Sequence, residues 1–192
     1  MIGSLAPLSD ANLMINQRFS SLFEQTYRRF LDVQKAEERA KEAKIEAAME
    51  RVRSAAMAMH KSEELAKVNS VVFKELKHLG FDPTVCGIGI YDKETKDSIW
   101  WQAFEDLDQI PRNFNMPYLD GHWFREISQA WENQVPYTLF QMVGEVREEH
   151  TKLAFAHTEM KDLPEEVKTY LAVTDFQIHY ISMMHGLSLI HI

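Results

Sequence analysis

Apolar residues recur at helical spacing from about Ser9 to Met59, and Glu, Lys and Arg fill most of the positions between them. The segment contains no glycine or proline, so no residue in it favours a break or a kink. A helix of this length extends roughly 70 Å at about 1.5 Å per residue, and a single helix cannot bury an apolar stripe of that length. The pattern therefore predicts one long helix that needs a partner along much of its length.

The C-terminal part of this stripe has the alternating three- and four-residue spacing of a coiled-coil seam. The expected seam consists of Ile45, Ala48, Val52, Ala55 and Met59. Small residues lie before and within it and favour a weakly packed seam that can adopt alternative arrangements. They are Ala36, Ala40, Ala43, Ala47 and Ala48. We expect a homodimer through this helix; the pattern is equally compatible with a partner helix in the same chain.

Cap and turn residues divide the chain after Met59 into shorter elements. Ser62 is a good N-cap for a second helix, and Gly80 is typical of the left-handed residue that ends one. Segments 85–91 and 98–104 flank a polar turn and predict a β-hairpin. Gly87 and Gly89 share one face of the first strand, which leaves room for another group to approach the backbone closely.

After the hairpin, helical and extended patterns alternate. The expected elements are a loop at 106–116, a helix capped by Asp120 and ending near Asn133, a strand at 135–140, a helix at 144–158, a short helix opened by Pro164 and a strand at 175–183. This order predicts an α+β domain with one mainly antiparallel sheet and helices on its faces. We therefore divide the chain into a long helix over residues 1–59 and an α+β domain over residues 60–192.

Charge separates the two halves of the chain. The first 80 residues carry 13 Lys and Arg against 11 Asp and Glu, whereas the rest carry 8 against 18. The acidic half disfavours nucleic acid and anionic membranes as partners, because phosphate binding needs clustered cations. No apolar run approaches the roughly 20 residues that cross a bilayer, and no basic leader opens the chain. The single cysteine, Cys86, fits a reducing cytoplasm, where we expect the protein.

The linker region resembles a known family. The segment from Lys44 to Leu65, KIEAAMERVRSAAMAMHKSEEL, the helix that follows to Gly80, and the strand GIGIY at 87–91 are similar to the linker and start of GAF-like sensory domains in bacterial signalling proteins such as sensor histidine kinases. The resemblance covers residues 44 to about 183. It implies a signal-relay module whose output domain, a kinase or cyclase, lies elsewhere in a larger protein.

The same resemblance indicates a fragment. Residues 8–30 resemble the final helix of a preceding domain of the same type. A GAF-like sheet normally continues past the position of residues 175–183, so we expect an incomplete C-terminus, with 187–192 as a truncated strand or non-native sequence. The family's motifs for cyclic nucleotides or a bilin-binding cysteine are not recognisable.

No residue pattern carries a catalytic site. His60 resembles the phosphoacceptor of sensor kinases, but Lys61 and Ser62 replace the acidic residue and the Arg-x-Pro-Leu run that follow it there. His150 and His157 are seven residues apart, whereas helical metal pairs sit four apart. Glycine-rich phosphate loops and Gly-x-Ser-x-Gly motifs are absent from the sequence. We expect no enzymatic activity, no metal and no cofactor.

Aromatic residues are concentrated between Trp100 and Phe155. A small-molecule pocket has this composition, and so does a packed core, which we favour for most of these residues. If a small ligand binds, the candidate lining residues are Trp101, Tyr118, His122, Trp123 and Tyr137.

Three functional hypotheses follow. The leading one is a non-catalytic relay in which the GAF-like domain biases the packing of a dimeric helix. The second is a dimerisation scaffold that binds no ligand. The third is histidine phosphotransfer through His60. We expect the wild type and His60→Ala to show no difference in phosphorylation.

Charging the proposed seam tests the register of the helix. Val52→Glu places a carboxylate in the seam and should weaken the dimer, whereas Arg51→Glu at the neighbouring position should weaken it much less. The molar mass of the two variants, measured by light scattering over a range of concentrations, checks this. Equal effects would contradict the assigned register.

Overall fold

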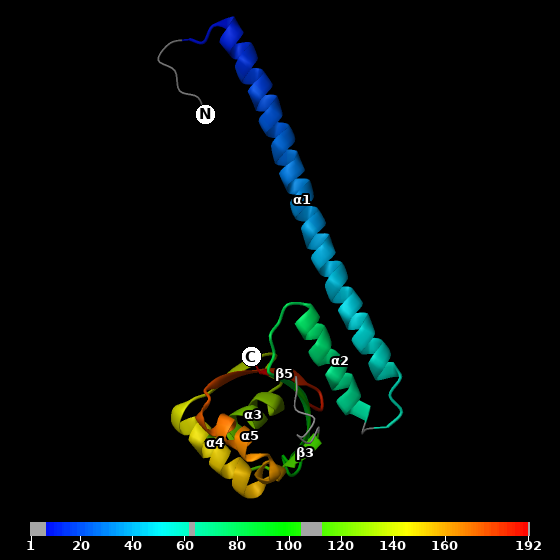
Figure 1. Ribbon diagram of the computed structural model, residues 1–192, viewed down its shortest axis with the longest axis vertical. Coiled ribbons are helices and arrows are strands. Elements are labelled where there is room, and N and C mark those ends of the chain that lie inside the picture. Colours follow the sequence, from blue (N-terminus) through cyan, green and yellow to red (C-terminus); the bar gives the residue numbers. More distant parts are fainter. Residues whose placement is uncertain (1–6, 62–63, 105–112, 192) are drawn as a thin grey trace. The chain divides into compact units, whose positions relative to one another are not determined.

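The computed structural model describes residues 7–61, 64–104 and 113–191. It contains the long helix α1, Asp10–Met57, followed by an α+β arrangement of shorter elements (Figure 1). The chain forms two compact units, one ending at Ala47 and the other beginning at Ala48. The last turns of α1 therefore belong to the globular unit. Within the described ranges, no helix combines the length and apolar character needed to span a membrane.

The N-terminal part of α1 carries a series of large apolar side chains that are exposed in the single chain. They are Leu13, Met14, Ile15, Phe19, Leu22, Phe23, Tyr27, Phe30 and Val33. A long helix with an uncovered apolar surface is not stable by itself in water, because most helical stability comes from packing. That a partner covers this surface stays a prediction of the sequence.

The expected seam residues at the C-terminal end of α1 are already covered within the single chain, which corresponds to the same-chain partner that the sequence pattern also allows. Ala48 is 3% exposed, and Ile45, Val52 and Ala55 are half-buried. Met59 lies beyond the end of the helix and is exposed, so it does not continue the seam.

Arg51→Glu is not a neutral control for Val52→Glu, because Arg51 makes specific contacts in the structure. Its Nε and Nη2 each donate a hydrogen bond of 2.7 Å to the carboxylate of Glu75 on α2, Leu65–His78. These hydrogen bonds lower the pKa of Glu75, whose side chain is 9% exposed. Arg51→Glu would set two carboxylates against each other. Arg53, which pairs with Glu50 on the surface of α1 itself, is the suitable control.

Six antiparallel strands form one sheet in the order β3-β2-β1-β6-β5-β4. Their bounds are β1 Val85–Tyr91, β2 Ser98–Phe104, β3 Asn113–Met116, β4 Thr138–Met142, β5 Phe176–Met183 and β6 Gly186–His191. The predicted α+β class and hairpin are confirmed, and the predicted antiparallel sheet is present. Residues 113–116, which we expected in a loop, instead pair with β2 as an edge strand. The rest of that loop lies outside the described residues.

The helices of the globular unit are α2, α3 His122–Glu132, α4 Gly144–His157 and α5 Glu165–Val173, with a 3-10 turn, η2, at Glu159–Asp162. Gly80 ends the α2 segment with a φ of 90°, as predicted. The predicted cap Ser62 lies outside the described residues. Strand β4 begins later than expected because Gln134, at a φ of 49°, makes a turn in which the Val135 N–H donates to the Ala130 carbonyl.

Asp120 does not cap α3 as expected. The N-cap is Gly121, which has no side chain to offer, and Asp120 forms an ion pair with Arg125. The free N–H of His122 instead donates to Glu149 Oε2 on α4 at 2.8 Å. This bond joins the start of α3 to the neighbouring helix.

The sheet separates two layers of helices (Figure 1). Helices α3, α4 and α5 lie on one face, where the main core is formed by alternate strand residues and the inward face of α3. Its buried members include Trp100, Phe114, Trp123, Ile127, Trp131, Phe140, Ile178, Tyr180, Leu187 and Leu189. Helix α2 lies on the other face, where Phe73 packs against Cys86 and Ala103. Trp123, Ile127 and Trp131 point inward from α3, as predicted.

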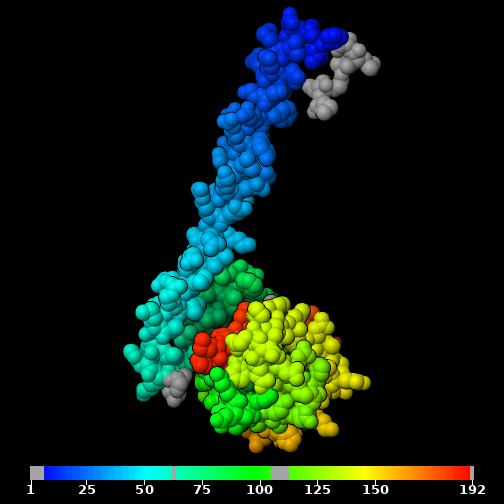
Figure 2. All heavy atoms as spheres, turned by 180° about the vertical axis from the view of Figure 1, so that it is seen from behind, coloured from blue at the N-terminus to red at the C-terminus, as the bar shows by residue number. Residues whose placement is uncertain are grey.

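Strand β6 occupies a central position although it follows every other described strand in the sequence. It pairs with β1 on one side and with β5 on the other. Figure 2 shows its segment, in red, next to side chains of earlier segments in green and yellow-green. The residues from 187 to 191, which we expected to be a truncated or non-native strand, thus form part of the centre of the sheet.

The close approach predicted for the glycine face of β1 is made by a tryptophan. Gly89 is paired with Trp100 across the β1–β2 ladder, and a Cβ on Gly89 would lie 2.6 Å from the indole ring. The ring itself is only 1% exposed. Glycine at position 89 is therefore what allows the Trp100 ring to lie close over the first strand.

Replacing Gly89 tests this packing. Gly89→Ala should destabilise the fold by about 2 kcal/mol, because overpacking a core commonly costs roughly 1–3 kcal/mol. The neighbouring Ile90→Ala, at a position 40% exposed, should cost less than about 1 kcal/mol. Urea denaturation followed by circular dichroism measures both. A loss at Gly89 no larger than that at Ile90 would contradict the proposed packing.

Candidate functional site

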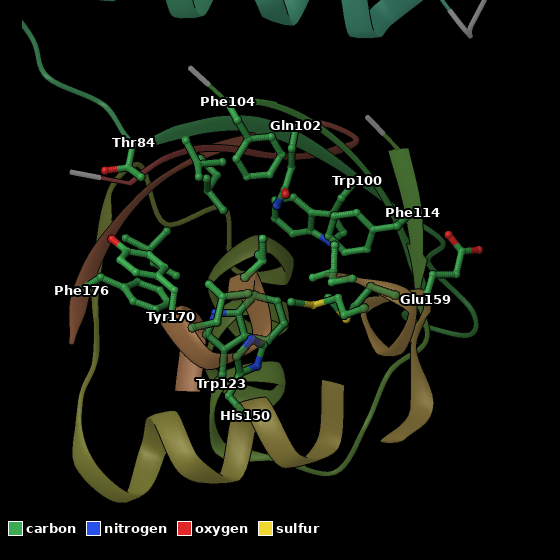
Figure 3. Close-up of a pocket in the computed structure, with 18 of the residues that line it drawn as sticks. Thr84, Trp100, Gln102, Phe104, Phe114, Trp123, His150, Glu159, Tyr170 and Phe176 are labelled. Atoms are coloured by element: carbon green, nitrogen blue, oxygen red, sulfur yellow. The ribbon is translucent and has the colours of Figure 1, made fainter. Parts of the chain in front are cut away.

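A cavity of about 160 Å³ lies between the sheet and the helices α4 and α5 (Figure 3). Strands β1, β2, β3, β5 and β6 supply one wall, and α3, α4, η2 and α5 supply the other. The lining is dominated by apolar and aromatic side chains, including Trp100, Phe104, Phe114, Met116, Trp123, Met160, Leu171, Phe176, Ile178 and Leu189. Cavities with this composition are typical of small-molecule sites.

Strand alternation selects the residues that face the cavity. Successive side chains of a strand point to opposite faces, so Trp100, Gln102 and Phe104 of β2 share one face and Trp101 and Ala103 share the other. The first set lines the cavity. In β5 the same alternation brings Ile178 and Tyr180 to it.

Two hydrogen bonds fix the indoles that form the cavity floor. The Trp123 Nε1–H donates to the Tyr180 hydroxyl at 2.9 Å, and the Trp100 Nε1–H donates to Ser98 Oγ at 2.9 Å. The Trp100 ring centroid lies 6.4 Å from those of Trp123 and Tyr180. Because both indole N–H groups are occupied within the core, these rings present only apolar surface to the cavity.

His150 is the polar exception in the lining. It projects from α4, and its ring centroid is 4.8 Å from that of Trp123 and 5.8 Å from that of Phe124 (Figure 3). Its Nδ1 is buried and has no hydrogen-bond partner among the described residues. Burial lowers the pKa of His150 from 6.5 to about 4, so the ring is neutral at physiological pH. A neutral imidazole has one nitrogen that donates and one that accepts.

Among the described residues, the lining contains no lysine or arginine. Its carboxyl group, Glu159, is exposed, and its Oε1 accepts a hydrogen bond of 2.9 Å from Asn115 Nδ2. The apolar walls would have to desolvate any bound charge without a counter-ion, which is costly. The cavity is therefore suited to a neutral molecule.

The structure brings one of the five predicted lining residues, Trp123, to the cavity. Trp101 lies on the opposite face of the sheet. Tyr118 packs at the edge of the main core, with Lys96 Nζ 5.7 Å from its ring. The other two lie elsewhere: His122 is 3.3 Å from Glu126, and the Tyr137 hydroxyl is 2.9 Å from His179 Nδ1.

Most residues that line the cavity are not predicted from the sequence. Only one of Trp100 and Trp101 can face the core, and the glycine face of β1 is the signal that could have selected Trp100. The spacing of His150 bears only on metal binding and does not point to a cavity. The contribution of α5, through Val167, Tyr170 and Leu171, depends on how that short helix folds back over the sheet, and no local pattern encodes this.

Other candidate residues are placed as follows. Cys86 is buried, and burial raises the pKa of its thiol to about 12. His60 is exposed after the end of α1, and its N–H donates to Glu64 Oε2 at 2.8 Å. No group of three or more His, Cys, Asp and Glu side chains that could hold a metal ion occurs within residues 7–61, 64–104 and 113–191.

Comparisons with models of protein families, with curated proteins and with solved structures found no match to this chain.

The buried imidazole predicts a specific pH dependence of stability. An unfolded chain protonates His150 near pH 6.5 and the folded chain only near pH 4, so its contribution to stability is complete above pH 6.5 and is lost as the pH falls toward 4. Between about pH 7 and pH 4.5 this loss should be about 2 kcal/mol.

His150→Gln should remove that part of the loss, whereas His157→Gln, at an exposed position of the same helix, should leave the wild-type dependence unchanged. Urea denaturation of the three proteins at both pH values measures the difference. A wild-type pH dependence in His150→Gln would show that His150 is protonated normally in the folded protein.

Proposed function

We propose that this chain is a non-catalytic sensory and relay module, in which a GAF-like domain binds a small molecule in the cavity and biases the packing of a dimeric helix. An output domain, a kinase or cyclase, would lie elsewhere in the full-length protein. The observation that carries the proposal is that β2 lines the cavity with one face and holds α2 with the other. A ligand that displaces β2 would therefore change the packing on both faces of the sheet.

The first step of the relay is the wall of the cavity. Trp100 and Gln102 alternate along β2 with Trp101 and Ala103. Ala103 packs in the small core beneath α2, together with Phe73 of that helix. Because a packed interior is dense, a shift of the β2 backbone cannot be absorbed without moving the side chains on its far face.

The second step is the attachment of α2. Asn69 of α2 is 1% exposed, and its Nδ2 donates to the Trp101 carbonyl at 2.6 Å. A second, longer bond of 3.4 Å reaches the Cys86 carbonyl of β1. A buried amide that loses its partner costs about 1–3 kcal/mol, so α2 is tied to the backbone of β2 rather than only resting on it.

The third step joins α2 to α1. Glu75 follows Asn69 on α2 after less than two helical turns, and it accepts both hydrogen bonds of the Arg51 guanidinium. Arg51 lies between the seam positions Ala48 and Val52. A rotation of α2 would pull on the end of α1 and, through the helix, on the exposed apolar residues upstream of it, which we propose as the contact between two copies. Two alternative packings of a weak contact are what a switch requires.

The dimerisation scaffold is the competing function. It shares the dimeric helix and lacks the coupling between the cavity and α1. A measurement of coupling therefore separates the two functions, and a measurement of mass alone does not.

A substitution that fills the cavity should change the packing of α1 between two copies of the chain. Val167 lines the cavity from α5, so Val167→Phe should act as a permanent occupant, whereas Thr169→Phe places the same ring at an exposed position. Ala40 lies seven residues after the exposed Val33 and so continues the exposed apolar stripe of α1. In an Ala40→Cys background, the rate of disulfide cross-linking between copies should change at least about threefold with Val167→Phe and stay constant with Thr169→Phe.

The native thiol of Cys86 is buried, so the thiol introduced by Ala40→Cys is the reactive one in this experiment. Gel electrophoresis after timed oxidation gives the rates. Cross-linking that is equally fast in all three proteins would favour the scaffold, and the absence of cross-linking from a protein that is monomeric by light scattering would contradict both functions.

A further inference from the structure

We infer that the cavity binds a small, neutral aromatic molecule of one ring or two fused rings whose polar group forms a hydrogen bond with His150 Nδ1. This inference rests on the proposed function, because it names the class of ligand for the site through which that function would act. Three properties of the cavity lead to it: its size, the absence of a cation among the described residues of its lining, and the unpartnered imidazole nitrogen.

The size of the cavity limits the ligand. At about 160 Å³ it is close to the roughly 150 Å³ engineered cavity in another protein that binds benzene. Drug-sized ligands occupy pockets of about 300–1,000 Å³. Nucleotides and tetrapyrroles are therefore too large, and a molecule of about six to ten heavy atoms fits.

The walls favour a flat, apolar ligand. Trp100, Phe114 and Phe176 offer ring faces and edges, and Met116 and Met160 offer thioethers, which adapt to aromatic surfaces. No lysine or arginine occurs in the part of the lining that the structure describes, and the Glu159 carboxyl adds negative charge. Both features disfavour carboxylates and phosphates.

His150 supplies the directional contact. Its Nδ1 is buried without a partner among the described residues, whereas the indole nitrogens of the cavity floor, on Trp100 and Trp123, are hydrogen-bonded within the core. A buried polar atom of this kind is a site for a ligand group or an ordered water. With the ring proton on Nε2, Nδ1 is an acceptor that a ligand N–H or O–H would satisfy and that an apolar ligand of the same shape would leave unpaired.

Indole and its carbon analogue indene provide matched probes. They share shape and area, and only indole has an N–H to donate. Isothermal titration calorimetry of the full chain should give a Kd for indole on the order of 0.1 mM, with indene about fivefold weaker. Benzoate should bind at least about tenfold more weakly than benzamide, which has the same size and shape and no charge.

Two variants locate the binding. Val167→Phe should abolish indole binding by filling the cavity, and Thr169→Phe should retain it. His150→Phe keeps an aromatic ring and removes the nitrogen, so the difference between indole and indene should disappear. Circular dichroism and thermal melting confirm that each variant is folded; if His150→Phe unfolds, His150→Leu replaces it.

Several results would overturn the inference. If indole does not bind at millimolar concentration, the proposed ligand class is wrong and an ordered water is the remaining partner for His150 Nδ1. Equal affinity for benzoate and benzamide would contradict the requirement for a neutral ligand. An unchanged preference for indole over indene in the folded His150 variant would remove His150 from the site.

The outcomes are separable from those of the relay. If indole fails to bind while Val167→Phe still alters cross-linking in the Ala40→Cys background, the ligand class is wrong and the relay stands. If indole binds while neither indole nor Val167→Phe alters that cross-linking, the ligand class stands and the relay fails.

Discussion

The pleat of β2 is the constraint on which the organisation of the globular unit depends. Consecutive residues of a strand must face opposite sides of a sheet, and in β2 these are two tryptophans, Trp100 and Trp101. Trp100 forms the floor of the cavity, and the carbonyl of Trp101 holds Asn69 of α2. A slip of the strand by one residue would exchange the two faces. The glycine at position 89 opposes this slip, because the Trp100 ring occupies the space that a side chain there would fill.

The sequence predicts the elements of this fold better than it predicts the site. The long helix, both strands of the hairpin and the inward face of α3 follow from local periodicity, since each element is long enough to repeat its pattern. Edge strand β3 has only four residues, Asn113–Met116, and its alternation is too short to distinguish from a loop. No local sequence pattern indicates the order of the strands in the sheet, because β1 pairs with β6, which lies at the far end of the described chain.

The site is harder to predict for the same reason. The cavity is lined by strands and helices from most of the globular unit, and their convergence is a property of packing rather than of any motif. Trp123 is predictable because a tryptophan on the apolar face of an amphipathic helix points inward. His122 and Tyr137 share its aromatic neighbourhood in the sequence, but they form polar contacts with Glu126 and His179. His150 becomes a candidate only because its buried Nδ1 has no hydrogen-bond partner among the described residues, and the sequence does not reveal this.

The central position of β6 also has a consequence for how the chain folds. The β1–β2 hairpin and the β5–β6 hairpin, whose strands are separated by residues 184 and 185 alone, form from local contacts, but the sheet is continuous only once β6 pairs with β1, which lies far from it in the sequence. Until that pairing forms, β1 and β6 each present an open strand edge, and open edges promote pairing with other chains. The pairing of β6 with β1 is therefore the step at which folding competes with aggregation, and its high sequence separation makes it slow.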